Sequence, residues 1–116
     1  MIIYFHPKCS TCKQALIFLK NKQVTFIEKD ITKEPPSITE LKKMLNFQGD
    51  EIKKLFNTSG LLYKEMELKN KLPHLNQDQA LQLLASNGML IKRPFLIGKD
   101  FGLVGFKESI WEKTLK

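Results

Sequence analysis

The sequence predicts an α/β fold built on a mixed four-stranded sheet. A strand–helix–strand pattern occupies the first thirty residues, and a strand–strand–helix pattern follows residue 90. Helical periodicity dominates the stretch between them. A strand, a crossover helix and a second strand form a parallel unit, whereas two strands joined by a tight turn pair antiparallel. The sheet is therefore expected to contain both kinds of pairing.

The first unit opens with the apolar run Ile2 to Phe5, which predicts a buried strand. A helix follows, for which Ser10 or Thr11 is the expected cap. Its apolar side chains recur at helical spacing, at Cys12, Ala15, Leu16 and Leu19. The stretch Val24 to Asp30 is rich in β-branched and aromatic residues, so it predicts the second strand.

The middle of the chain, about residues 36–90, is expected to be a helical insertion. EPPS at 34–37 interrupts the strand pattern, and Ser37 with Glu40 has the spacing of a capping box. Asn76 is the expected cap of a later helix that stops at Asn87 and Gly88. Between these two helices we expect three shorter pieces. A short amphipathic segment covers 52–56, a loop covers 57–60, and an irregular helix covers 61–72.

The last unit predicts a hairpin and a closing helix. Phe95 to Ile97 and Phe101 to Gly105 are the two strands, and Lys107 to Leu115 is the helix. The whole order is that of the thioredoxin-like fold with a helical insertion, and residues 1–116 form one domain. Such folds place a cis-proline before the third strand, facing an active cysteine. We therefore expect Pro94 to be cis.

Composition restricts the classes of function. No apolar run approaches the roughly 18 residues of a membrane span, and the opening apolar run is too short for a secretory signal. We therefore expect a cytoplasmic protein with no membrane partner. The net charge is +7, but the basic residues are scattered, which favours a solvated lysine-rich surface over direct nucleic-acid binding. Among the 19 basic residues only Arg93 is an arginine, so its planar fork is a candidate for a specific role.

Cys9 and Cys12, in CSTC, are the only two cysteines. A structural disulfide between them would close too small a loop to stabilise the chain much. A zinc site needs about four ligands, and His6 and His74 lack the spacing to complete one with the cysteines. No metal is expected. Buried thiols that act as inert apolar side chains remain an alternative.

A redox pair fits the position of the cysteines better. Cys9 falls where a strand meets a helix, so the free N–H groups of the first turn point at its sulfur. Lys8 and Lys13 add positive potential, and all of these lower a thiol pKa. Cys12 lies one turn further along, within reach of a mixed disulfide on Cys9. The pattern indicates Cys9 as nucleophile, Cys12 as resolving thiol, and a redox disulfide between them.

Several motifs resemble the arsenate reductase-like family, which contains ArsC and the regulator Spx. They are CSTCKQA near the start, EPPSITELKKML after the second strand, LLASNGMLIKRPFLI, and GFKE near the end. The resemblance covers essentially the whole chain. FNTSG and the following LLYKE are similar to a branch of small members labelled arsenate reductase family or Spx/MgsR family.

The resemblance implies roles for particular residues. The family's catalytic cysteine falls on Cys9, and its arginine before the cis-proline falls on Arg93, which would bind an oxyanion over the sulfur. Pro94, together with Lys8, Ser10 and Thr11, is expected to form the rest of the substrate-binding surface. Glutaredoxin-dependent arsenate reductases use three arginines, whereas this chain has one. Arsenate itself is therefore a doubtful substrate.

Two functions follow from the resemblance. The first is a thiol-dependent oxidoreductase that binds no cofactor and is regenerated by thioredoxin, glutaredoxin or glutathione. The second is an Spx-like redox-sensing regulator that binds the C-terminal domain of the RNA polymerase α subunit. In the second case, disulfide formation would change the start of the first helix and hence the binding surface.

Overall fold

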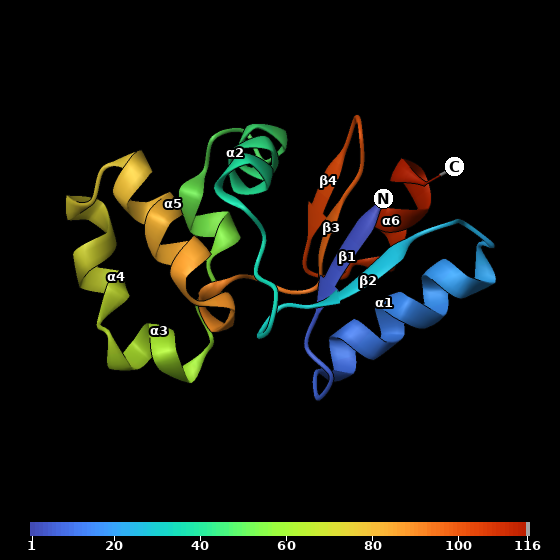
Figure 1. Cartoon of the computed structure of the whole chain (residues 1–116), viewed down its shortest axis with the longest axis horizontal. Helices are drawn as coiled ribbons and strands as arrows, with labels where there is room; N and C mark the ends of the chain where they lie inside the picture. The colour runs from blue at the N-terminus through green and yellow to red at the C-terminus, as the bar shows by residue number, and fades with distance from the viewer. Residues whose placement is uncertain (116) are drawn as a thin grey trace.

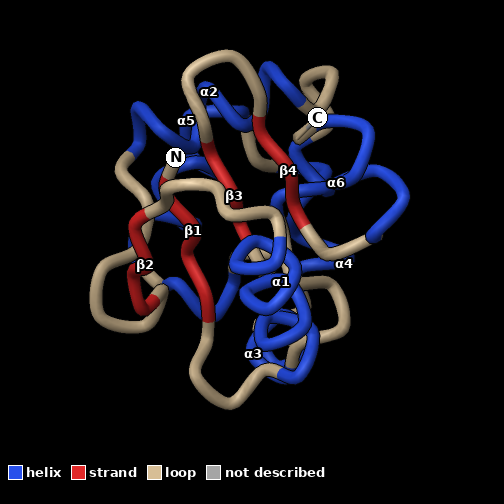
Figure 2. Tube along the Cα trace, turned by 90° about the vertical axis from the view of Figure 1, so that its right-hand side faces the viewer, coloured by secondary structure: helices blue, strands red, loops and turns tan. Residues whose placement is uncertain are grey.

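The computed structural model describes residues 1–115, and its centre is a four-stranded mixed sheet. The strands are β1 (Ile2–Phe5), β2 (Ile27–Asp30), β3 (Phe95–Ile97) and β4 (Gly102–Val104). They lie in the order β2-β1-β3-β4, which is visible across the sheet in Figure 2. β1 pairs parallel with β2, and the other two pairs are antiparallel. The expected mixture of pairings is confirmed.

Helices cover both faces of this sheet. On one side lie α1 (Ser10–Asn21) and α6 (Glu108–Thr114), and the helices between β2 and β3 lie on the other (Figure 1). We call this second group, residues 38–90, the insertion. It contains α2 (Ile38–Phe47), η1 (Ile52–Leu55), α3 (Leu61–Glu65), α4 (Leu68–Lys71), η2 (Leu72–His74), α5 (Gln77–Ser86) and η3 (Gly88–Leu90).

Alternation along the strands builds a separate apolar core on each face. Ile3 and Leu96 belong to the cluster formed with α1 and with Trp111 of α6. Tyr4 and Phe95 belong to the cluster formed with the insertion. This follows from the two-residue period of a strand, which sends successive side chains to opposite faces.

Both predicted helix caps in the insertion are present. Ser37 accepts the N–H of Glu40 at 3.1 Å, and Glu40 accepts the N–H of Ser37 at 3.0 Å. Asn76 makes the equivalent reciprocal pair with Gln79 at the start of α5. Each box satisfies two backbone donors that a helix start would otherwise leave free.

Other boundaries differ from the prediction. β2 begins at Ile27 rather than Val24, because its pairing with β1 starts at Ile2, the first residue of that strand. The irregular helix at 61–72 is broken between α3 and α4 by Glu67, whose φ of 52° lies in the left-handed region, and α4 continues directly into the 3-10 helix η2. A non-glycine residue rarely adopts that conformation, and it ends a helix.

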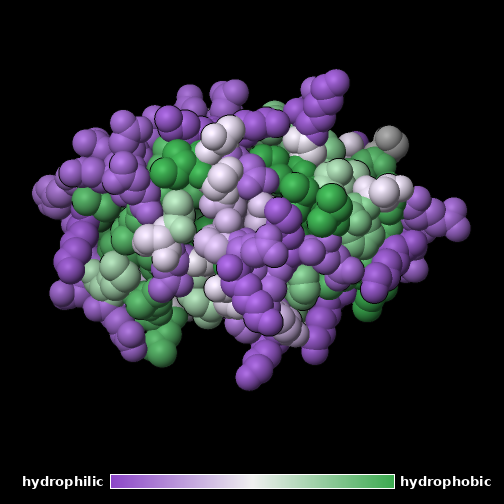
Figure 3. Space-filling model, viewed as in Figure 1, coloured by the Kyte–Doolittle hydropathy of each residue, from purple (hydrophilic) through white to green (hydrophobic). Residues whose placement is uncertain are grey.

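The surface is mainly hydrophilic on the face drawn in Figure 3, with hydrophobic residues in smaller patches. Within residues 1–115, no helix combines the length and the apolar character needed to cross a membrane.

Candidate active site

Cys9 is itself the N-cap of α1. Its backbone is extended, with φ −91° and ψ 117°, and its Sγ accepts the backbone N–H of Cys12 at 3.3 Å. The prediction that Ser10 or Thr11 caps the helix is wrong, because Ser10 already begins the helix and Thr11 follows within it. The sulfur occupies the place that a serine or aspartate oxygen takes at most helix starts.

This position stabilises the thiolate of Cys9. Partial burial raises the pKa of Cys9, but hydrogen bonds from Cys12 and the guanidinium of Arg93 outweigh it. The net pKa lies below the ordinary value for a thiol. Cys9 remains half-buried rather than sealed, so the sulfur is both ionisable and reachable.

Cys12 has the opposite environment. Its side chain is completely buried on the inner side of α1. Burial, with the neighbouring charge of Cys9, raises the pKa of the Cys12 thiol to about 12. Both cysteines are free thiols. One turn of helix thus separates the Cys9 sulfur, whose pKa is lowered, from the Cys12 sulfur, whose pKa is raised.

The segment before β3 brings the lone arginine to the cysteines. The Arg93–Pro94 peptide bond is cis, which confirms the expected isomer. Backbone hydrogen bonds hold the segment on both sides, from Lys92 N–H to Leu55 at 2.8 Å and from Gly105 N–H to Pro94 at 2.9 Å. The guanidinium of Arg93 packs against Met89, with Nη1 3.8 Å from the Met89 sulfur. It makes no ion pair with any carboxylate among the described residues.

The other predicted site residues lie around this pair. Lys8 and Ser10 are exposed on either side of Cys9, and Thr11 is half-buried. His6 shapes the loop, since its backbone carbonyl accepts the N–H of Cys9 at 3.0 Å and its Nδ1 accepts the N–H of Lys8 at 3.0 Å. Within residues 1–115, no group of three or more histidine, cysteine or acidic side chains is placed to hold a metal ion.

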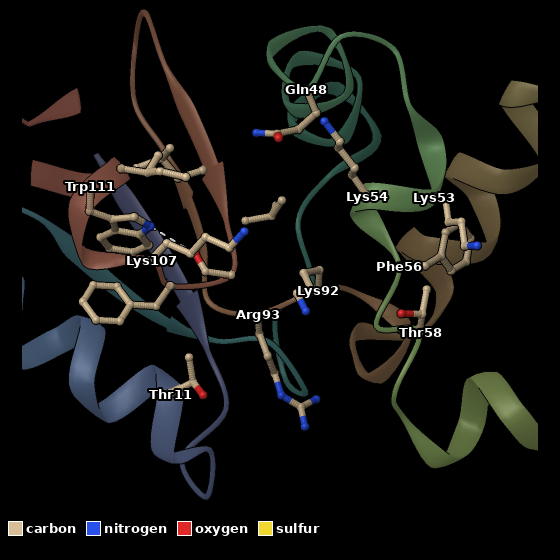
Figure 4. A pocket seen from close by; sticks show the side chains of 15 residues that line it. Thr11, Gln48, Lys53, Lys54, Phe56, Thr58, Lys92, Arg93, Lys107 and Trp111 are labelled. Carbon is tan, nitrogen blue, oxygen red and sulfur yellow. Dashed lines mark hydrogen bonds between the residues drawn. The ribbon is translucent and has the colours of Figure 1, made fainter. Parts of the chain in front are cut away.

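A groove of about 550 Å³, which Thr11 and Arg93 line but neither cysteine does, was not predicted (Figure 4). It runs between the insertion on one side and β4 with α6 on the other, and both Thr11 and Arg93 line it. Four lysines also line it: Lys53, Lys54, Lys92 and Lys107. The adjacent pairs Lys53–Lys54 and Lys92–Arg93 are visible in the sequence, but only the fold brings them together.

The fold and the cysteine position define the class. A β2-β1-β3-β4 sheet, a CxxC at the start of the first helix and a cis-proline before β3 make this a thioredoxin-like protein. Within that class the chain belongs to the ArsC family, whose sequence pattern matches residues 4–114.

Individual relatives fall into two groups by name. The chain is 44% identical to the uncharacterized protein YusI of Bacillus subtilis, over 98% of this chain and 97% of YusI. It is 29% identical to the global transcriptional regulator Spx of Enterococcus faecalis, over 94% of this chain and 81% of Spx.

Solved structures of other proteins are similar to this chain in both sequence and fold. A protein from Bacteroides fragilis described as ArsC family related superposes with a TM-score of 0.90 at 40% identity, covering 97% of this chain and 94% of that one. A possible arsenate reductase from Streptococcus mutans gives 0.89 at 39% identity, covering 97% and 96%.

Proposed function

We propose that the protein is a thiol-dependent oxidoreductase with Cys9 as the nucleophile and Cys12 as the resolving thiol. The observation that carries the proposal is the contrast between the two sulfurs. Cys9 is half-exposed, caps α1 and has a lowered pKa, whereas Cys12 is buried directly behind it with a raised pKa. A nucleophile needs the thiolate form and access, and a resolving thiol needs proximity.

The reaction proceeds through two exchanges. The Cys9 thiolate attacks one sulfur of a disulfide RS–SR, forms a Cys9–SR bond and releases RS⁻. Cys12 then loses its proton, attacks the Cys9 sulfur and releases the second RS⁻. The substrate gains two electrons, and the protein ends with a Cys9–Cys12 disulfide. An external thiol, from thioredoxin, glutaredoxin or glutathione, reduces that disulfide again.

The charges of the site set the order of these steps. While Cys9 is a thiolate, its charge helps to hold the proton on Cys12. In the mixed disulfide the Cys9 sulfur carries no charge. It therefore no longer raises the pKa of Cys12, and the Cys12 thiol ionises more readily. Arg93 binds the anionic part of the substrate, Thr11, Ser10 and Lys8 form the surrounding surface, and the buried cis-Pro94 shapes the backbone next to Arg93. Because both thiols must start reduced, the proposal places the protein in the cytoplasm.

Exchange of each cysteine tests the proposal. Cys9→Ser should abolish reduction of a model disulfide, because a serine hydroxyl cannot replace the thiolate. Cys12→Ser should accumulate a Cys9 mixed disulfide that intact-protein mass spectrometry detects. Cys9→Ser with full activity would refute the assignment. Assays with arsenate belong in the same series, and we expect low turnover because a single arginine faces the site.

The matches to Spx support a second candidate, a redox-sensing regulator that binds RNA polymerase through its α subunit. The relevant feature is the Cys12 N–H bond to the Cys9 sulfur, which forms the first turn of α1. A Cys9–Cys12 disulfide would alter that turn and the surface beside it. Capture of the purified protein, reduced and oxidised, on the isolated C-terminal domain of the polymerase α chain distinguishes the two functions. Binding that changes with the disulfide favours the regulator.

A further inference from the structure

The groove beside the cysteines has an uneven charge distribution. Five basic side chains line it, from three separate parts of the fold: Lys53 and Lys54 in η1, Lys92 and Arg93 before β3, and Lys107 at the start of α6. Its volume of about 550 Å³ is that of a small-molecule site.

Acidic side chains do not balance these cations. No aspartate or glutamate of the described chain lines the groove. Among the five basic groups, only Lys54 has a carboxylate partner within residues 1–115, Glu51 at 3.7 Å. Like charges gathered in a cleft repel one another and raise the local concentration of anions. The groove is therefore suited to a ligand with several negative charges.

The charges are arranged along the groove. Figure 4 places Arg93 with Thr11 at one end and Lys54 with Gln48 at the other, with Lys92 between them. Arg93 is also the group whose charge acts on Cys9. A ligand lying in the groove would thus have one end at Thr11 and Arg93, next to Cys9, and the other among lysines.

Apolar side chains form the rest of the wall. Phe56 on the insertion side and Leu103, Val104 and Phe106 on the sheet side line the groove between the charged groups. Such a wall accommodates an uncharged arm that joins a sulfur to a distant anion.

We propose that the groove binds the disulfide of a phosphate-bearing thiol of the phosphopantetheine class, with the phosphates among Lys54, Lys92 and Lys107. This rests on the proposed oxidoreductase function and names its substrate class. A phosphopantetheine arm carries a sulfur at one end, phosphate at the other and no ammonium group. Glutathione disulfide has four carboxylates but also two ammonium groups, which the cations of the groove repel and no carboxylate of its lining balances.

The reaction is balanced within the pair. Cys9 attacks the coenzyme A disulfide, forms a Cys9–S–coenzyme A bond and releases one coenzyme A thiolate. Cys12 gives up its proton to solvent and displaces the second thiolate. One protein dithiol is oxidised, one disulfide is reduced to two thiols, and no further reductant is needed for a single turnover.

The test follows single turnover of fully reduced protein with four disulfides at low ionic strength. These are coenzyme A disulfide, 4′-phosphopantetheine disulfide, pantethine, which is the same arm without phosphate, and glutathione disulfide. We expect the two phosphate-bearing disulfides to react about 30-fold faster than pantethine, within the range of electrostatic steering, and the difference to shrink as salt is added. Equal rates for pantethine and coenzyme A disulfide would overturn the proposal.

A double variant tests whether the groove lysines cause the faster reaction of phosphate-bearing disulfides. Lys54→Gln with Lys92→Gln should slow coenzyme A disulfide about tenfold more than it slows pantethine. Its matched control is Lys42→Gln with Lys69→Gln, which removes the same charge from exposed helix positions outside the groove. Equal slowing by both variants would show a general charge effect and overturn the site.

The remaining outcomes separate this proposal from the one on which it rests. If 4′-phosphopantetheine disulfide is as fast as coenzyme A disulfide, the shared phosphate arm is recognised. If coenzyme A disulfide alone is fast, the adenosine part is needed as well, and the phosphopantetheine class is too broad. Fast reaction with glutathione disulfide or pantethine alone refutes the substrate class and leaves the oxidoreductase function intact. Failure with all four and with bis(2-hydroxyethyl) disulfide refutes both.

Discussion

The two faces of the sheet contribute different components to one site. The face covered by α1 and α6 supplies the thiols, since Cys9 caps α1 and Cys12 lies inside it. The face covered by the insertion supplies Lys53 and Lys54, and α6 on the opposite face adds Lys107 at its start. Arg93 lies on the segment that joins the insertion to β3. The site is therefore assembled along the line where the two layers meet, and neither layer contains it alone.

Several contacts fix the insertion to the sheet. Tyr4 in β1 donates a hydrogen bond to Glu40 in α2 at 2.8 Å. The side-chain amide of Gln48 donates to the carbonyl of Gly102 in β4 at 2.9 Å. At Gly88, the backbone of the insertion lies directly against the carbonyl of Ile31. Changes at these contacts test how far the two layers depend on each other.

The largest expected effect sharpens the contrast between the two thiols. With a pKa of about 12, Cys12 at pH 7.5 is ionised in roughly one molecule in thirty thousand, whereas the lowered pKa of Cys9 favours its thiolate. We expect iodoacetamide to modify Cys9 at least about 1,000-fold faster than Cys12. Peptide mass spectrometry of the reduced wild-type protein measures both rates in one sample.

The pH dependence of the same reaction adds a second check. A lowered pKa means that the Cys9 rate should reach half its plateau at a lower pH than the rate of an ordinary exposed thiol, such as free cysteine. Arg93→Gln should move that midpoint upward, because it removes a charge that favours the thiolate. Comparable rates for the two cysteines, or a Cys9 midpoint above the ordinary value, would contradict the assignment of the nucleophile.

The next effect is expected where the insertion meets the loop after β2. A Cβ at residue 88 would lie 1.9 Å from the carbonyl oxygen of Ile31, which is backbone and has little freedom to move. Gly88→Ala should therefore lower the free energy of unfolding by about 3 kcal/mol, at the upper end for overpacking. Urea denaturation followed by circular dichroism measures the loss.

Gly49→Ala is the matched control for Gly88. At Gly49 a Cβ would meet nothing within 4 Å, but φ is +72°. We expect a cost of about 1 to 2 kcal/mol from the left-handed backbone alone. If Gly88→Ala costs no more than this control, the contact with Ile31 is looser than the structure describes, and the two layers are less tightly joined.

Much of the fold could be predicted because local signals agreed with it. Ser37–Glu40 and Asn76 mark helix starts through hydrogen bonds between near neighbours, and such short-range geometry is written in the sequence. The apolar run Ile2 to Phe5 likewise coincides with β1. The cap itself was misassigned because serine and threonine are the usual caps, whereas here the sulfur of Cys9 takes that role.

Features set by distant contacts could not be predicted. The length of β2 depends on where β1 begins, and the break at Glu67 depends on a backbone conformation that glutamate rarely adopts. The cationic groove requires Lys54, Lys92 and Lys107 to converge from positions far apart in the chain. Scattered lysines indicated a solvated surface, and only their convergence in three dimensions distinguishes a site from such a surface.

The smallest expected effect concerns the hydrogen bond between the two layers. Tyr4→Phe removes the donor to Glu40, whose carboxylate keeps its bonds from the Ser37 N–H and hydroxyl. Because no buried group is left without a partner, we expect a loss of only about 1 kcal/mol. Tyr63→Phe is the control, since Tyr63 is also buried but makes no side-chain hydrogen bond among the described residues.

The pH dependence of that loss tests whether the Tyr4 hydroxyl is buried and hydrogen-bonded as the structure describes. Burial and the bond to Glu40 raise the pKa of Tyr4 above its ordinary value. A raised pKa in the folded state stabilises the protein below about pH 10, and that stabilisation is lost as the pH rises further. Phenylalanine does not titrate, so the stability difference between wild type and Tyr4→Phe should narrow above pH 10. Urea denaturation at pH 8 and at pH 10.5 measures the difference, and a difference that stays constant would mean that the Tyr4 hydroxyl is neither buried nor bonded to Glu40 in solution.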